Sequence, residues 1–247
     1  MTLLSLKVMA TSEPLPTVQE VMPRVLQASA NENTQYHAFN NHYSYRRERT
    51  TAFYDFSGGL KSFEDKYSTN TPSPVVVIPH NDPPPERVSA PSRQVEQSSG
   101  PSIHGVPLGK KEDLLNPDII RRFKFTIVGR EMYNGRPTLM VDFKPASGNL
   151  PILNIKDRFI NSMAGSALID EQDYTLVKAD IHLMQKVTLL GGAAGTVYKF
   201  TFSFARERTP DGYWFSRDMN WHLEAQEATY KRVIVHDEKI TGVQKKM

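Results

Sequence analysis

Between Phe123 and Phe143 the sequence reads FKFTIVGREMYNGRPTLMVDF, two alternating segments on either side of an Asn-Gly pair. Successive side chains of a β-strand point to opposite faces, so the apolar residues of each segment share one face. Asn134-Gly135 suits the turn of a two-residue hairpin, because both residues accept positive φ angles. The stretch therefore predicts an antiparallel hairpin with one apolar and one polar face.

The same alternation continues toward the C-terminus and also occurs near the N-terminus. Tyr43–Phe56 alternates and is closed by a turn at Ser57-Gly58-Gly59, and Asp211-Gly212 predicts a second hairpin turn. Further strands are expected over residues 63–67, 167–169, 175–187, 197–206, 213–223 and 230–235. The pattern predicts an α+β fold that is mainly β, with a large antiparallel sheet whose apolar face two or three helices cover.

Three segments have helical patterns. Thr17-Val18-Gln19-Glu20 is a capping box that begins a helix reaching about Phe39, in which Pro23 predicts a kink or a restart. Asn116-Pro117 predicts a short helix through Arg122. Apolar residues at helical spacing predict another helix over residues 152–163, ended by Gly165.

The bulk composition is that of an ordinary globular protein. The chain has 247 residues, 39% hydrophobic and 23% charged, with a net charge of +3 and no cysteine. This length suits one domain, and the lack of cysteine excludes disulfides and thiol catalysis. The sequence contains no apolar run of ~18 residues, which is the length needed to span a membrane. Basic residues are mixed with acids, and in Tyr43–Arg49 a glutamate interrupts the basic and aromatic run, so no nucleic acid is expected as a partner.

The chain divides into a short N-terminus and one domain. Residues 1–16 are expected to be a flexible N-terminus or the remnant of an export signal, since Val8-Met9-Ala10 ends like a cleavage site. Residues 17–247 then form a single domain. A loop rich in proline and serine is expected at 68–109, where Val75–Ile78 is an apolar island that could add an edge strand.

Polar clusters give little sign of catalysis or metal binding. His222 and Glu224 lie two residues apart on a strand, but structural metal sites require four ligands. His236-Asp237-Glu238 and Asp170–Asp173 are expected at strand ends or turns. Gly191–Gly195 precedes a strand and fits no phosphate-binding motif. No catalytic signature is present, so neither enzyme activity nor a cofactor is expected.

The apolar face of the sheet is the remaining candidate for a site. It is either an ordinary core or the wall of a cavity between the sheet and its helices. In the second case the lining residues are Phe125, Ile127, Leu139, Val141, Phe143, Ile181, Leu183, Phe200, Phe202, Phe204, Phe215 and Trp221.

Two stretches carry a resemblance to a known family. They are FTIVGREMYNGRP at 125–137 and ALIDEQDYTLVK at 167–178, and they combine with the N-terminal helix that leads to Tyr43-Ser44-Tyr45. Over residues 17–243 the chain resembles the outer-membrane lipoprotein carrier (LolA-like) superfamily, in particular its uncharacterised secreted branch. The resemblance implies an unclosed half-barrel, curved over helices that act as a lid, with an apolar cavity for acyl chains and export to the periplasm. The sequence departs from the family in two ways: no position matches the carrier's acyl-handling arginine, and the 68–109 loop resembles an insertion.

These observations favour a periplasmic or secreted binding protein for a lipid or an acylated, lipoprotein-like ligand, without covalent chemistry. One alternative is an envelope sensor or assembly partner that binds a peptide or lipoprotein, with another envelope protein as a transient partner. A lipid hydrolase is the other alternative, and it would need Ser, His and Asp side chains converging at the cavity mouth.

Overall fold

The computed structural model describes residues 13–70, 102–103, 106–107, 117–147, 150–152, 155–189, 195–227 and 230–246. Within these ranges the chain is mostly β, with four short helices. The helices are α1 (Val18–Ala30), α2 (Glu32–His42), α3 (Pro117–Ile120) and α4 (Ile155–Ile160). The strands are β1 (Tyr43–Tyr54), β2 (Leu60–Asn70), β3 (Ser102–Ile103), β4 (Val106–Pro107), β5 (Phe123–Tyr133), β6 (Arg136–Pro145), β7 (Met163–Asp170), β8 (Leu176–Leu183), β9 (Val187–Leu189), β10 (Gly195–Arg208), β11 (Trp214–Glu227) and β12 (Tyr230–Lys245).

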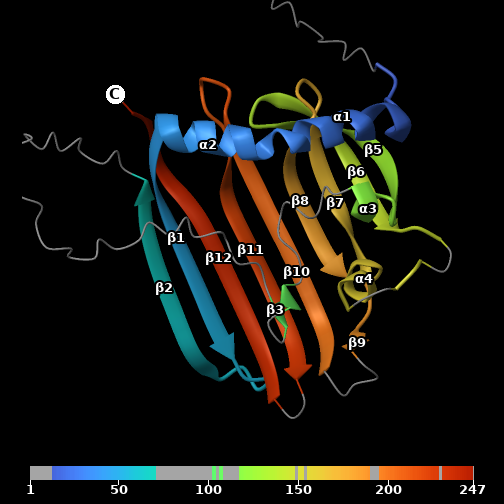
Figure 1. Ribbon diagram of the computed structural model, residues 1–247, viewed down its shortest axis with the longest axis vertical. Helices are drawn as coiled ribbons and strands as arrows, with labels where there is room; N and C mark the ends of the chain where they lie inside the picture. The colour runs from blue at the N-terminus through green and yellow to red at the C-terminus, as the bar shows by residue number, and fades with distance from the viewer. Residues whose placement is uncertain are drawn as a thin grey trace, which may run out of the picture.

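One large antiparallel sheet dominates the structure (Figure 1). Its strand order is β2-β1-β12-β11-β10-β8-β7-β6-β5, with β9 also paired to β10. The order ends at β2 and β5, so the described strands do not close into a barrel. The predicted α+β, mainly β fold with an open antiparallel sheet is therefore confirmed. Pairing of β1 with β12 places the first long strand of the chain beside the last.

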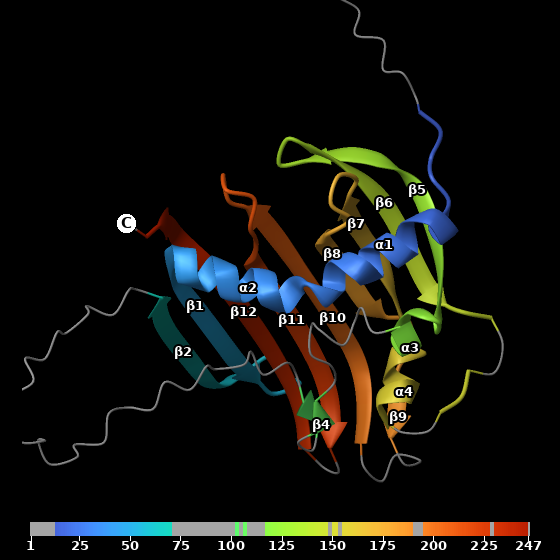
Figure 2. The ribbon, with the colours of Figure 1, turned by 45° about the horizontal axis from the view of Figure 1, so that its top comes forward.

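Two helices cross one face of this sheet as a long band (Figures 1 and 2). We call the face that α1 and α2 cover the helix face, and the opposite one the outer face. The capping box begins α1 as predicted: the hydroxyl of Thr17 accepts from the N–H of Glu20 at 3.3 Å, and the N–H of Thr17 donates to the Glu20 carboxylate at 2.7 Å. The helix does not restart at Pro23, because α1 runs through this residue, and the break between α1 and α2 lies at Asn31 instead. Val21 and Val25 are buried on either side of the proline, and packing of this kind stabilises a helix more than propensity does.

Gly165 does not end a helix, contrary to the prediction. The helix there is only Ile155–Ile160, and both Met163 and Gly165 belong to β7. A Cβ atom at Gly165 would lie 2.2 Å from the backbone oxygen of Asp180 and 2.8 Å from Cζ of Phe143. The glycine therefore permits a close approach of β8 and of the Phe143 ring, which is a strand role for this residue type.

The last strand is much longer than predicted. β12 runs to Lys245 rather than ending at residue 235, so His236-Asp237-Glu238 lies inside a strand and not at its end. His236, Glu238 and Ile240 are buried while Asp237 and Lys239 are exposed, which is the alternation of a strand with one covered face. Charged residues at the covered positions concealed this pattern in the sequence.

The predicted hairpin turns are present. Asn134 and Gly135 have φ angles of 49° and 76°, as a tight two-residue turn requires. Gly58 and Gly212 also have positive φ angles in the β1–β2 and β10–β11 connections. Four expectations lie wholly or mostly outside the described residues: the export signal at Val8-Met9-Ala10, the loop at 68–109, the edge strand at Val75–Ile78 and the glycine-rich segment before β10.

The core lies between the helices and the helix face. Val21 and Val25 of α1 join a large buried cluster with side chains from the sheet, including Leu139, Phe204 and Leu223. A bulge between Val197 and Lys199 interrupts the alternation of β10, so that Val197 is buried and Tyr198 is exposed. Under α2, the ring of Phe39 stacks on Tyr43, Tyr45 and Phe215 with centroids 5.5, 5.3 and 4.9 Å away.

Candidate functional site

The strand register lines up one residue from each strand in rows that cross the helix face. Two adjacent rows are apolar from β5 to β11, apart from one glycine, and become polar from β12 to β2. The first row is Phe125, Phe143, Gly165, Ile181, Phe202, Trp221, His236, Thr51 and Glu64. The second row is Ile127, Val141, Ala167, Ala179, Phe204, Met219, Glu238, Arg49 and Lys66.

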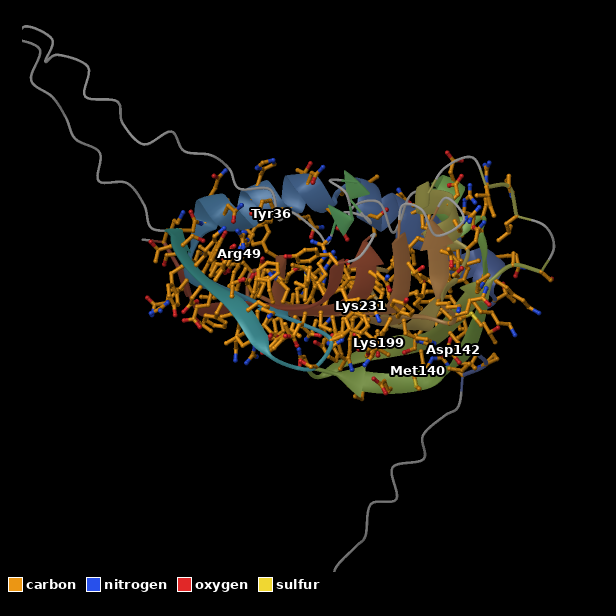
Figure 3. The ribbon with its side chains drawn as sticks, turned by 90° about the horizontal axis from the view of Figure 1, so that it is seen from below. Tyr36, Arg49, Met140, Asp142, Lys199 and Lys231 are labelled. Carbon is orange, nitrogen blue, oxygen red and sulfur yellow. The ribbon has the colours of Figure 1, made fainter. Side chains whose placement is uncertain are left out.

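Figure 3 separates the two faces. Arg49 of β1 and Tyr36 of α2 lie on the helix side of the sheet, whereas Lys199 and Asp142 lie on the other side. The helix face thus has two parts. We call the β5–β11 side the apolar part and the β12–β1 side the charged part.

The apolar part contains most of the predicted lining. Eleven of the twelve predicted residues belong to one cluster or pack against it, and Phe215 lies apart under α2. Their contact with a ligand stays a prediction, but their exposure divides them. Seven are buried: Leu139, Val141, Ile181, Phe200, Phe204, Phe215 and Trp221. Five are only partly buried: Phe125, Ile127, Phe143, Leu183 and Phe202.

The partly buried aromatic side chains form two groups, one around Phe143 and one at Phe202. Phe143 lies 5.4 Å from Phe123 and 6.1 Å from Phe125 between ring centroids. On β10, Phe202 lies 5.9 Å from Phe204, which is 2% exposed. Gly165 leaves the space that the Phe143 ring occupies on β7. We call these two groups of half-buried rings, which Gly165 and Ile181 separate along the first row, the aromatic surface.

The charged part is built on Glu238. Its carboxylate lies 2.8 Å from Nε of Arg49 and 3.4 Å from Nε of Arg47. The three side chains are 8%, 13% and 11% exposed, respectively. Nη2 of Arg47 also donates to the hydroxyl of Tyr36 at 3.3 Å, which ties this group to α2. Burial raises the pKa of the neighbouring Tyr45 to about 12, so that its hydroxyl stays protonated.

His236 lies where the two parts meet. Its ring stacks on Trp221 at a centroid distance of 5.2 Å, and Nδ1 lies 2.9 Å from the Thr51 hydroxyl. Burial lowers the pKa of His236, although Glu238 works in the opposite direction. The imidazole is therefore mainly neutral at neutral pH and fits the edge of an apolar surface.

Sequence reasoning missed the charged part. As a candidate site, Tyr43–Arg49 was considered only for nucleic acid, and His236-Asp237-Glu238 was expected only at a strand end or turn. Arg47 and Arg49 instead face the helices and bind Glu238. The available signal was the period of two, which places His236, Glu238 and Ile240 on one face of a strand.

The other polar clusters have structural partners. On the outer face, His222 lies 2.8 Å from Glu224, which is also 3.4 Å from Lys199. Asp170 accepts two bonds from Arg136, at 2.5 and 2.7 Å, and backbone N–H bonds in its turn. Burial would raise the pKa of Asp170, but these bonds outweigh it and hold the pKa below its usual value. Across the described ranges, no group of three or more His, Asp or Glu residues is arranged for a metal ion.

None of the helices in the described ranges has the length and apolar character needed to cross a membrane.

Comparison with known proteins gives only remote structural likenesses. No family model and no curated protein matches the chain. Among solved structures, a domain from Vibrio parahaemolyticus described as an outer membrane lipoprotein-sorting protein is similar over 94% of each chain, with 13% identity and a TM-score of 0.37. A LolA superfamily protein from Nitrosomonas europaea is similar over 94% of this chain and 95% of its own, with 8% identity and a TM-score of 0.32. A DUF1329 family protein from Desulfovibrio piger covers 92% and 94%, with 10% identity and a TM-score of 0.31. The Nitrosomonas europaea structure bears the name of the superfamily that residues 17–243 resemble.

Proposed function

We propose that this protein binds a lipid or an acylated, lipoprotein-like ligand on the apolar part of its helix face, without covalent chemistry. The observation that carries the proposal is the half-buried aromatic surface around Phe143 and Phe202. Phe200 and Phe204 on the same strand are buried, at 6% and 2% exposed, as core side chains commonly are. An acyl chain that covers this surface would gain ~0.8 kcal/mol for each methylene removed from water.

The first test asks whether a lipid is bound at all. Native mass spectrometry of the purified protein should reveal a co-purified species that is released on denaturation and has the mass of a lipid. A fluorescent fatty acid should then bind to the delipidated protein and be displaced by unlabelled lipid. Protein that is free of lipid and binds no probe would reject the function.

A pair of adjacent substitutions localises the binding. Phe202→Asp places a carboxylate on the aromatic surface and should abolish probe binding, because a charge facing an acyl chain must be desolvated. Ser203→Asp is the matched control: it introduces the same charge one residue along β10, on the outer face, where Ser203 bonds to Asn220 at 2.5 Å. Equal loss of binding in both folded variants would place the ligand elsewhere.

A lipid hydrolase remains the second candidate, because His236 lies 2.9 Å from the Thr51 hydroxyl. In that function the imidazole would act as a base toward the hydroxyl. Carriage and hydrolysis differ in what happens to an ester ligand. We expect an acyl ester to be recovered unchanged after incubation with the protein, and release of free acid that Thr51→Val abolishes would establish the hydrolase instead.

Export to the periplasm is part of the proposal. It rests on Val8-Met9-Ala10, which ends like a cleavage site. When the chain is expressed from its natural upstream codons, it should be recovered from the periplasm with its N-terminus cut near Ala10. Uncut protein confined to the cytoplasm would reject this part of the proposal alone.

A further inference from the structure

The two edge strands of the large sheet differ in their exposure (Figure 1). In β5, residues alternate between exposed and half-buried over most of the strand, as expected when one face packs against a core. In β2, every residue from Leu60 to Thr69 is exposed, on both faces of the sheet. Among the described strands β2 has one neighbour, β1, so one row of its backbone N–H and C=O groups has no strand partner there.

Although it is exposed, β2 is held in place and carries large apolar side chains. At its C-terminal end the amide of Asn70 donates to the backbone oxygens of Asn40 and Tyr43, at 2.8 and 2.9 Å. Phe63 and Tyr67 are 57% and 56% exposed, and both point to the outer face of the sheet. An ordered edge strand with exposed apolar side chains is a template on which a further strand can pair.

The charges of β2 favour a second copy of the same strand as that partner. Two copies related by a two-fold axis perpendicular to the sheet pair antiparallel, and residues opposite each other then lie on the same face. With the axis at Asp65, Glu64 of each copy is opposite Lys66 of the other, on the helix face. Phe63 is then opposite Tyr67 on the outer face, and all eleven residues of β2 have a partner.

Other registers of the same symmetry give fewer favourable pairs. An axis at Glu64 or at Lys66 sets that residue against its own copy and leaves the opposite charge facing a serine. An axis at Phe63 pairs Lys61 with Asp65, but it includes only residues 60–66 of the strand. The axis at Asp65 has one unfavourable contact, between the two Asp65 carboxylates, and this contact makes the register testable.

We propose that β2 is a dimerisation strand, through which two copies of this protein pair edge to edge with the two-fold axis at Asp65. The ten-stranded sheets of the two copies then continue into each other, and both helix faces lie on the same side. A contact of one strand from each copy is small, so monomer and dimer should coexist in the micromolar range. This inference is independent of the proposed lipid binding.

Analytical ultracentrifugation of the unmodified protein gives the first test. The fraction of dimer should rise with protein concentration. A monomer at every concentration up to about 1 mM, where even a weak specific contact would form, would overturn the proposal. A protein that dimerises only after Val75–Ile78 is replaced by glycine and serine would overturn it as well, because this segment of the chain would then be the strand that covers β2.

Charge reversal tests the pairing of Glu64 with Lys66. Glu64→Lys and Lys66→Glu each set like charges against each other at two places and should weaken dimerisation at least about tenfold. The variant with both substitutions restores the opposite pairs and the original net charge, so it should dimerise as the unmodified protein does. Asp142→Lys, at an exposed position on the outer face of β6, is the control and should have no effect. A double variant as weak as the single ones would overturn this pairing.

Cysteine substitutions locate the two-fold axis, because the chain has no cysteine of its own. Directly opposite Cα atoms of antiparallel strands lie about 4.5–5.5 Å apart, which a disulfide can span. Asp65→Cys should therefore give a disulfide-linked dimer under mild oxidation. Thr69→Cys is the control on the same face of β2 and should stay monomeric, since Lys61 lies opposite it. Equal cross-linking in both variants, or stronger cross-linking in Phe63→Cys than in Asp65→Cys, would overturn the register.

Asp65→Asn tests the same axis without a covalent link. It removes the one contact between like charges, so the dimer should become severalfold tighter. Asp142→Asn removes the same charge far from β2 and should leave the dissociation constant unchanged. If the two variants had equal dissociation constants, the Asp65 carboxylates would not face each other, and the position of the axis would be overturned.

Discussion

Strands β10 and β12 present the same pleat to the same helices with opposite chemistry. In the two rows that Phe202 and Phe204 occupy on β10, β12 has His236 and Glu238. Aromatic burial is non-directional and tolerates local change. Burial of Glu238 is stabilising only while the arginines beside it satisfy its charge. The stability of the apolar part therefore depends on the apolar area that it buries. The stability of the charged part depends on every partner in its ion pairs.

The largest effects are expected in the apolar half of this comparison. Phe204→Ala should lower the free energy of unfolding by about 3–5 kcal/mol, because the ring is fully buried in the core. Phe202→Ala should lower the free energy of unfolding by clearly less than Phe204→Ala does, since solvent already reaches part of the Phe202 ring. Urea unfolding of the two variants measures both losses. Equal losses would mean that Phe202 is an ordinary core residue and would remove the observation on which lipid binding rests.

Glu238→Gln tests the charged half. Glu238→Gln removes the buried carboxylate that both guanidinium groups share, and a loss of about 3 kcal/mol in the free energy of unfolding is expected. Glu224→Gln is the control on the outer face, where the pairs with His222 and Lys199 should contribute under about 1 kcal/mol. Urea unfolding of both variants at neutral pH makes the comparison. If Glu238→Gln left the free energy of unfolding unchanged, the arginines would be well solvated without their carboxylate.

The same contrast explains how much of the fold the sequence predicts. Alternation and turn residues predicted the Phe123–Phe143 hairpin and β10, where every covered position between bulges is apolar. They failed beyond residue 235, because a buried glutamate is compatible with a strand only when distant arginines pair with it. Gly165 was misjudged for a similar reason: its close contacts with Phe143 and Asp180 come from neighbouring strands, and helix-ending chemistry is a local signal.

The candidate site divides along the same line. The apolar part of the site could be predicted from the period of two. The difference in exposure between Phe202 and Phe204 could not, because it depends on where the helices lie. The charged part requires the pairing of β1 with β12, two strands that are about as far apart in the chain as any two can be. A single sequence carries the alternation of each strand but not the register that brings Arg49 opposite Glu238.

Acidification should give the smallest effect, and it acts at the boundary between the two parts. Burial, supported by Arg49 and opposed by Glu238, lowers the pKa of His236 below its ordinary value of 6.5. Between these two pKa values the unfolded chain binds the proton and the folded protein does not, so stability falls as the pH drops below about 6.5. His236→Gln keeps a polar partner for Thr51 but cannot titrate, and its stability should change less over this window. Because the variant also loses the stacking on Trp221, the slopes of stability against pH are compared, not the absolute values.

His182→Gln, which replaces an exposed histidine on the outer face, is the control and should keep the slope of the unmodified protein. An unchanged slope in His236→Gln would mean that water reaches the imidazole and that the boundary of the apolar part lies closer to β10.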